Sequence, residues 1–169
     1  MTGEPRRRAF LSLGSNLGDR VDYLEHARAA LAALPGTSVV AASRVYETSP
    51  QEREDQGAFL NQVVCIDTGL APHDLLGKCQ AIEAQNGRRR DIRFGARTLD
   101  IDILLIEGVE SDAPELTLPH PRMVGRAFVL VPLLELWGFA RGMPDLDVAG
   151  LGGTAAGDQR VELYDATKG

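Results

Sequence analysis

The chain has 169 residues, 44% of them hydrophobic and 25% charged, which suits one globular domain with a sizeable core. Its formal net charge of −6 argues against general nucleic-acid binding. The apolar run after the three arginines at 6–8 is too short for a signal peptide, and no stretch is long enough to span a membrane. We therefore expect a cytoplasmic protein with a single domain over residues 1–169, in which residues 1–8 and about 150–169 are peripheral.

Four elements are predicted in the first half of the chain. Residues 9–13 form a short apolar strand. Asp19 can cap a following helix that ends at Pro35 and Gly36 and whose apolar residues recur three and four apart: Leu24, Ala27, Leu31 and Leu34. Residues 38–48 and 59–68 predict two strands that pair with each other across a polar loop.

A second helix and a further strand are predicted next. Pro72 suits the first turn of a helix that ends at Asn86 and Gly87. The apolar face of this helix is formed by Leu75, Leu76, Cys79 and Ile82. Residues 101–106, which are mostly Ile and Leu, predict a buried strand.

Gln80 and Glu83 form a polar pair on the second predicted helix. They are three residues apart and so share a face, which is expected to lie away from Leu75 and Leu76. That face either is simply solvated or turns toward whatever the following arginine-rich loop binds.

The predicted order of elements is β-α-β-β-α-β, which is typical of a ferredoxin-like α+β sandwich with an antiparallel sheet and two helices packed on one face. C-terminal additions follow this unit. Pro132 is expected to kink or restart a helix in the apolar stretch that ends at Trp137. From Gly150 onward the sequence is loop-like, with a last strand at residues 161–164.

The two cysteines predict free thiols rather than a disulfide framework, because Cys65 and Cys79 form no C-x-x-C motif. Cys65 lies in an apolar, strand-like run and Cys79 on the apolar face of a predicted helix. We expect both thiols to be buried and reduced.

Asp100 and Asp102, the acid pair, are the most informative residues of the chain. Because strand side chains alternate, both point to the same side of the predicted strand, where two carboxylates repel each other. A bound divalent cation would remove that repulsion. Arginines stand directly upstream, at positions 88, 89, 90, 93 and 97. Acids and cations side by side suit a polyphosphate, since Mg²⁺ bridges its oxygens and guanidinium groups bind the rest.

Plainer interpretations of these residues stay open. Arg93 or Arg97 could neutralise the acid pair without a metal, and a run of arginines is often only an exposed face. Residues 14–18 lie between a strand and a helix, but they lack the Lys and hydroxyl of a P-loop and do not match G-x-G-x-x-G. A nucleotide would therefore be bound without a P-loop.

Six motifs stand in a recognisable order along the chain. They are L-G-S-N-L-G-D-R (13–20), Y-E-T-S-P (46–50), F-L-N (59–61), Q-A-I-E-A-Q-N-G-R-R-R (80–90), R-T-L-D-I-D-I-L-L (97–105) and L-P-H-P-R-M (118–123). Together they resemble the 6-hydroxymethyl-7,8-dihydropterin pyrophosphokinase family of folate biosynthesis, over roughly residues 9–136. The resemblance implies a ferredoxin-like α+β sandwich. It also implies transfer of the β,γ-pyrophosphoryl group of ATP to the pterin hydroxymethyl oxygen, with release of AMP.

The resemblance further implies which residues bind. Asp100 and Asp102 would ligate two Mg²⁺ ions and, with Arg88 and Arg97, carry the catalysis. The positions that contact ATP are Gln80, Glu83, Arg88, Arg90, Arg97, Ile103, Thr117, His120 and Arg126. Those that contact the pterin are Thr48, Asn61, Phe94 in a closing loop, and the two aromatic residues that sandwich the ring, Phe59 and Phe128. From the residues alone, Phe59 and Phe128 would be ordinary core residues.

Two other functions would use the same features. A ferredoxin-like RNA-binding module needs exposed aromatic residues and a basic sheet face, whereas aromatic residues are only 5% of this chain. A two-metal nuclease would suit the acid pair, but the arginine cluster is too small for a long polyanion. We therefore expect a diphosphotransferase whose partners are ATP and the pterin, without nucleic acid or membrane, and which is a monomer.

Overall fold

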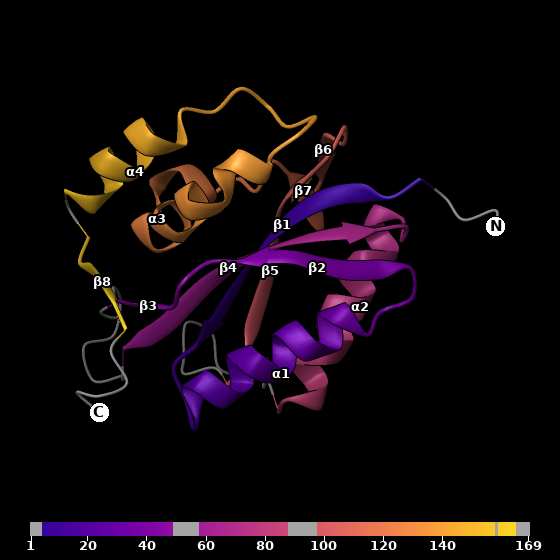
Figure 1. Ribbon diagram of the computed structural model, residues 1–169, viewed down its shortest axis with the longest axis horizontal. Helices are drawn as coiled ribbons and strands as arrows, with labels where there is room; N and C mark the ends of the chain where they lie inside the picture. The colour runs from indigo at the N-terminus through magenta and orange to yellow at the C-terminus, as the bar shows by residue number, and fades with distance from the viewer. Residues whose placement is uncertain (1–4, 49–57, 88–97, 158, 165–169) are drawn as a thin grey trace.

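The structure, a computed structural model, describes residues 5–48, 58–87, 98–157 and 159–164. Its centre is an antiparallel sheet in which β5 pairs with β1, β1 with β4, and β4 with both β2 and β3, while β8 extends the sheet beside β3 (Figure 1). The elements in chain order are β1 (Arg7–Ser15), α1 (Arg20–Ala32), β2 (Thr37–Ala42), β3 (Tyr46–Thr48), β4 (Phe59–Thr68), α2 (Pro72–Gln85), β5 (Asp100–Ile106), β6 (Ser111–Ala113), β7 (Leu116–Leu118), η1 (Met123–Gly125), α3 (Ala127–Leu136), η2 (Trp137–Phe139), α4 (Val148–Ala156) and β8 (Val161–Leu163).

Helices cover both faces of the sheet, α1 and α2 on one side and α3 and α4 on the other (Figure 1). The side chains of β1 point alternately to the two faces of the sheet, so β1 contributes to both hydrophobic cores. Leu11 and Leu13 face α1 and α2, whereas Phe10 faces α3 and contacts Trp137 with ring centroids 5.7 Å apart. None of the helices in the described part of the chain has both the length and the apolar content that a membrane span requires.

The predicted ferredoxin-like order is confirmed, because β1, α1, the β2–β3 segment, β4, α2 and β5 follow one another and β1 lies between β4 and β5. The local signals for the two helices are confirmed as well. Asp19 caps α1 by accepting a hydrogen bond from the Asp22 backbone N–H at 3.3 Å. Pro72 is the first residue of α2, where a missing N–H costs nothing.

The strand predicted over residues 38–48 is in fact two strands, β2 and β3, which pair with opposite ends of β4. The interruption is centred on Ser43. Its Oγ accepts a hydrogen bond from Val63 N at 3.0 Å, and its carbonyl oxygen accepts one from Gln62 Nε2 at 2.6 Å. Side chains therefore replace part of the regular ladder here, and a period-2 pattern cannot reveal that.

One prediction for the C-terminal region is wrong. The stretch from Gly150 was expected to be loop-like, yet residues 148–156 form α4, which Asp147 caps by accepting from Gly150 N at 3.0 Å. Small residues allow α4 to pack closely on α3, since a Cβ at Gly152 would lie 3.4 Å from Leu130 Cβ. Pro132, which was expected to kink or restart a helix, lies inside α3, among buried residues that hold the helix in place.

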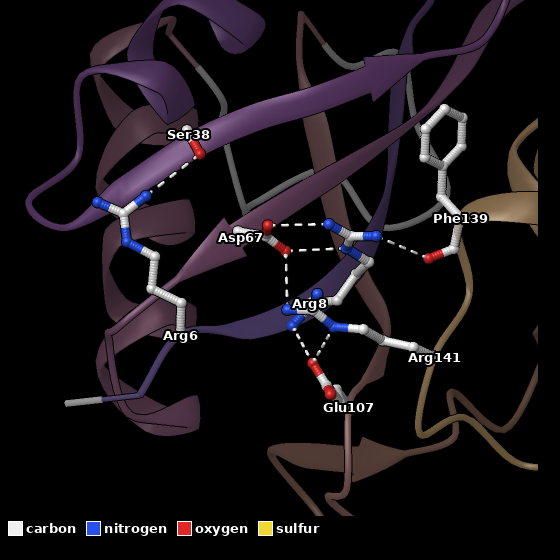
Figure 2. Close-up of polar contacts among 7 residues, drawn as sticks. All are labelled: Arg6, Arg8, Ser38, Asp67, Glu107, Phe139 and Arg141. Carbon is white, nitrogen blue, oxygen red and sulfur yellow. Dashed lines mark hydrogen bonds and ion pairs between the residues drawn. The ribbon is translucent and has the colours of Figure 1, made fainter.

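A network of charged side chains joins four parts of the chain at one end of the sheet (Figure 2). Arg8 on β1 binds both carboxylate oxygens of Asp67 on β4, at 2.9 Å each, and donates to the Phe139 carbonyl oxygen at 3.1 Å. Glu107, which follows β5, accepts from the Arg8 backbone N–H at 2.8 Å and from Arg141 Nε at 3.0 Å. The segment after η2 is thereby fastened to β1, β4 and β5.

Cys65 and Cys79 are buried free thiols, as predicted. Burial raises the pKa of the Cys65 thiol to about 11 and that of the Cys79 thiol to about 12. At neutral pH both are protonated, so neither has the thiolate character of a nucleophile.

Candidate active site

The acid pair lies on β5, the edge strand of the described sheet, and both carboxylates face away from α1 and α2. Ile101 and Ile103, which alternate with the acids, are buried in the core beneath those helices. The Cα partners of Asp100 and Asp102 on β1 are Gly14 and Ser12. Because these partners are small, the sheet beside the two carboxylates carries little side-chain bulk.

The predicted pterin residues Phe59, Asn61 and Thr48 lie on the same sheet face and at the same end of the sheet. Gly14 is the common neighbour, since it pairs with Asp100 on one side and with Asn61 on the other. A Cβ at Gly14 would lie 3.3 Å from Asn61 Oδ1 and 3.8 Å from Phe59 Cδ1. The glycine therefore leaves the room that these two side chains occupy.

Asn61 and Thr48 are both buried and bonded to each other. Asn61 Nδ2 donates to Thr48 Oγ1 at 2.9 Å, across the pairing of β4 with β3. The bond holds the amide in one orientation and leaves its oxygen as an acceptor beside Gly14.

His120 is close enough to Asp100 and to two arginines for their charges to act on it. Its backbone N–H donates to the Leu104 carbonyl of β5 at 2.9 Å, and its Nδ1 accepts from Arg122 N at 3.2 Å. Burial and the positive charges of Arg126 and Arg122 lower the pKa of His120, while the negative charge of Asp100 acts in the opposite direction. The imidazole is therefore neutral at neutral pH, with its proton on Nε2.

Arg126 and Phe128 flank the first residue of α3. The guanidinium carbon of Arg126 lies over the Phe128 ring, 5.4 Å from its centroid, and both side chains are half-buried. Among the described aromatic residues, only Phe10 and Trp137 have their rings in contact, so Phe59 and Phe128 do not stack on each other. The predicted sandwich requires the two rings to be separated, with the flat ligand between them.

Glu83 does not share the environment of Gln80, contrary to the sequence prediction. Gln80 is exposed, whereas Glu83 is 3% exposed and its Oε2 accepts a hydrogen bond from Ile101 N at 2.8 Å. Position 83 is four residues after Cys79, so it continues the buried stripe of α2. That spacing was the signal in the sequence that would have placed Glu83 on the core face.

Two further predicted ATP residues, Ile103 and Thr117, lie in different surroundings. The Ile103 side chain is buried in the core beneath α1 and α2, on the face opposite the acid pair, so only its backbone atoms could reach a nucleotide there. Thr117 is half-buried on β7, and its hydroxyl donates to the Ala113 carbonyl oxygen at 3.0 Å within the β6–β7 hairpin.

Four predicted site residues lie outside the described residues: Arg88, Arg90, Phe94 and Arg97. In the part of the chain that is described, no group of three or more His, Cys, Asp and Glu residues comes together. The acid pair thus offers two carboxylates. This donor set suits Mg²⁺, which is commonly bound through one or two carboxylates together with the phosphates of a substrate.

The chain is similar to enzymes that act on pterins. The family model described as 7,8-dihydro-6-hydroxymethylpterin-pyrophosphokinase matches residues 10–138. The 2-amino-4-hydroxy-6-hydroxymethyldihydropteridine pyrophosphokinase of Methylorubrum extorquens is 49% identical over 143 residues, which are 85% of this chain and 87% of the relative. The protein of the same name from Bacillus subtilis is 47% identical over 128 residues, which are 76% of this chain and 77% of the relative.

A solved structure has the same fold. The crystal structure of wild-type Plasmodium falciparum HPPK-DHPS superposes with a TM-score of 0.65 at 13% identity. The superposition covers 91% of this chain but only 45% of the solved chain, so this chain spans less than half of that longer protein. At this level of identity the likeness concerns the fold alone.

Proposed function

Because the chain belongs to the 7,8-dihydro-6-hydroxymethylpterin-pyrophosphokinase family, we propose that it transfers the β,γ-diphosphate of ATP to the hydroxymethyl oxygen of 6-hydroxymethyl-7,8-dihydropterin. The products are AMP and the pterin diphosphate, an intermediate of folate biosynthesis. One observation carries the assignment of the site. The acid pair and Asn61 lie at the same end of one sheet face, and the charge of Asp100 acts on His120, although these residues come from three separate motifs.

Asp100 and Asp102 would hold two Mg²⁺ ions together with the phosphate oxygens of ATP. When bound, the ions neutralise the charge that builds up as the bond between the α- and β-phosphates breaks. The two carboxylates are well suited to this, because they share a face and their neighbours on β1 are Gly14 and Ser12.

His120 and Arg126 provide donors for the phosphates. With Nδ1 occupied by the Arg122 N–H, the neutral imidazole keeps its Nε2–H as a hydrogen-bond donor. Arg126 adds a permanent positive charge close by. The predicted contributions of Arg88 and Arg97 would complete the set by stabilising the departing α-phosphate.

Asn61, Thr48 and the two phenylalanines account for the pterin. The Asn61 amide is held by Thr48, so its oxygen is preorganised to accept an N–H of the heterocycle. Phe59 and Phe128 offer ring faces for a flat substrate, and stacking contributes about 0.5–1.5 kcal/mol beyond the area buried.

The nucleotide product tests the proposal. The chain is incubated with ATP, Mg²⁺ and the hydroxymethyl-dihydropterin, and the nucleotides are resolved by chromatography. We expect AMP in equal amount to the pterin diphosphate and only in the presence of the pterin. A pterin-dependent release of ADP, or AMP formed without the pterin, contradicts the assignment.

A further inference from the structure

The part of the chain that follows the family match contacts the candidate site. The family model matches residues 10–138, whereas α4 and β8 lie beyond it. Strand β8 pairs with β3 so that Val161 is the partner of Thr48 and Leu163 that of Tyr46 (Figure 1). The C-terminal segment is therefore built into the sheet directly beside a predicted pterin residue.

Gln159, just before β8, binds the beginning of α3 with both ends of its amide. Its Oε1 accepts a hydrogen bond from Ala127 N at 2.8 Å, and its Nε2 donates to the Gly125 carbonyl oxygen at 2.7 Å. The first N–H groups of a helix have no partner within the helix. The cap residue of α3, Arg126, makes no capping hydrogen bond with its side chain. Gln159 thus supplies the cap from a distant part of the chain.

The two residues on either side of this contact are Arg126 and Phe128. We propose that Gln159 is a positioning residue for the reaction: by fixing the first turn of α3, it sets the direction of the Arg126 guanidinium and the Phe128 ring. This inference rests on the proposed function. The guanidinium lies over the ring, 5.4 Å from its centroid, so a shift of the backbone between them would move both.

The rest of α3 does not depend on Gln159. Its far end is held by Glu135, which accepts hydrogen bonds from the Tyr46 hydroxyl and from Arg44 N. Its middle is buried in the second core through Leu130 and Leu133. Loss of the Gln159 amide should therefore loosen only the first turn, where the two predicted ligand-binding side chains are attached.

The test is Gln159→Ala in the full chain. We expect the KM for the pterin to rise about tenfold, the equivalent of one lost hydrogen bond of about 1.4 kcal/mol, with kcat within about twofold of wild type. Gln159→Glu keeps an acceptor for Ala127 N but places a second acceptor against the Gly125 carbonyl. Its KM for the pterin should therefore lie between those of wild type and Gln159→Ala. Arg160→Ala is the matched control, since among the described residues this exposed side chain pairs with its near neighbour Glu162, at 2.8 Å.

A double-mutant cycle shows whether Gln159 acts through the ring. In a Phe128→Ala background, Gln159→Ala should change the pterin KM by less than about twofold, because the ring through which it acts on the pterin is gone. Full, independent effects of the two substitutions on KM would overturn the proposal. So would a lower kcat and melting temperature in Gln159→Ala without any change in KM, which would make Gln159 a structural cap. A wild-type chain that forms no AMP would refute the proposed function instead.

Discussion

Glu83 is the residue that ties α2 to the acid pair. Its carboxylate binds the backbone N–H of Ile101, which is the residue between Asp100 and Asp102. An edge strand leaves such N–H groups without a partner from the sheet. By satisfying this one from α2, Glu83 fixes the backbone from which both acids project.

Asp102→Asn is expected to lower the rate of AMP formation by about 10³-fold or more, because the amide keeps the shape but removes the charge that binds Mg²⁺. The thermal unfolding midpoint should stay close to that of wild type, since the side chain is half-buried at the sheet surface. Asp112→Asn, an exposed acid on β6, is the control and should leave both quantities unchanged. Normal turnover of Asp102→Asn with Mg²⁺ would show that the metal is bound elsewhere.

At the scale of elements, the sequence predicted those parts whose signals are local. Asp19 directly precedes α1, Pro72 is the first residue of α2, and the apolar run of residues 59–68 is β4 itself. These three elements were therefore predicted close to their observed bounds. Helix α4 was missed because three of its nine residues are glycine, which disfavours a helix interior. It is stabilised by close packing on α3, which only the tertiary structure provides.

In the candidate site, too, the features with local sequence signals were predicted and those that depend on tertiary contacts were not. The acid pair and Asn61 belong to short motifs, and the alternation of strands was enough to place both acids on one face. The cap that Gln159 provides could not be predicted, because it joins residues 32 apart in sequence without any pattern between them. Glu83 was assigned to the wrong face because a charged residue is expected at the surface, although its position four residues after Cys79 indicated the core face.

Gly77→Ala should stabilise the protein by about 0.5–1 kcal/mol, because glycine in a helix interior carries a larger entropy cost on folding than alanine. Gly77 lies within α2 and is exposed. Apart from its chain neighbours and the backbone of its own helix, no atom of the described residues lies within 4 Å of the position of a new Cβ. Gly87, just after α2, has φ +81°, so Gly87→Ala should instead destabilise by about 1 kcal/mol. Urea unfolding of both variants measures the difference, and equal shifts would contradict it.

At the scale of the whole molecule, the charged network around Arg8 makes stability depend on pH (Figure 2). The hydrogen bonds from Arg8 lower the pKa of Asp67 below its ordinary 3.8, and the Arg8 backbone N–H lowers that of Glu107 below 4.5. A carboxyl whose pKa is lower in the folded state stabilises the fold above its unfolded pKa. That contribution is lost as the pH falls through the folded value.

Asp67→Asn should therefore lower the free energy of unfolding by about 1–3 kcal/mol at neutral pH, because Arg8 and Arg141 lose the charge that they face. The difference from wild type should shrink as the pH falls through the lowered folded-state pKa of Asp67, because the wild-type carboxyl is then protonated as well. Urea unfolding at a series of pH values measures this. Glu162→Gln, which breaks an exposed pair, should have little effect at any pH, and a pH-independent loss in Asp67→Asn would rule out the charge as its cause.

The late position of Gln159 in the chain has a consequence for biosynthesis. A protein is made from its N-terminus, and the segments that emerge first can fold first. Both aspartates, Asn61 and all of α3 are synthesised before Gln159 and β8. A growing chain can thus assemble the sheet with its carboxylates while the first turn of α3 is still uncapped. The half of the site that would receive the pterin is completed only when the last strand joins β3.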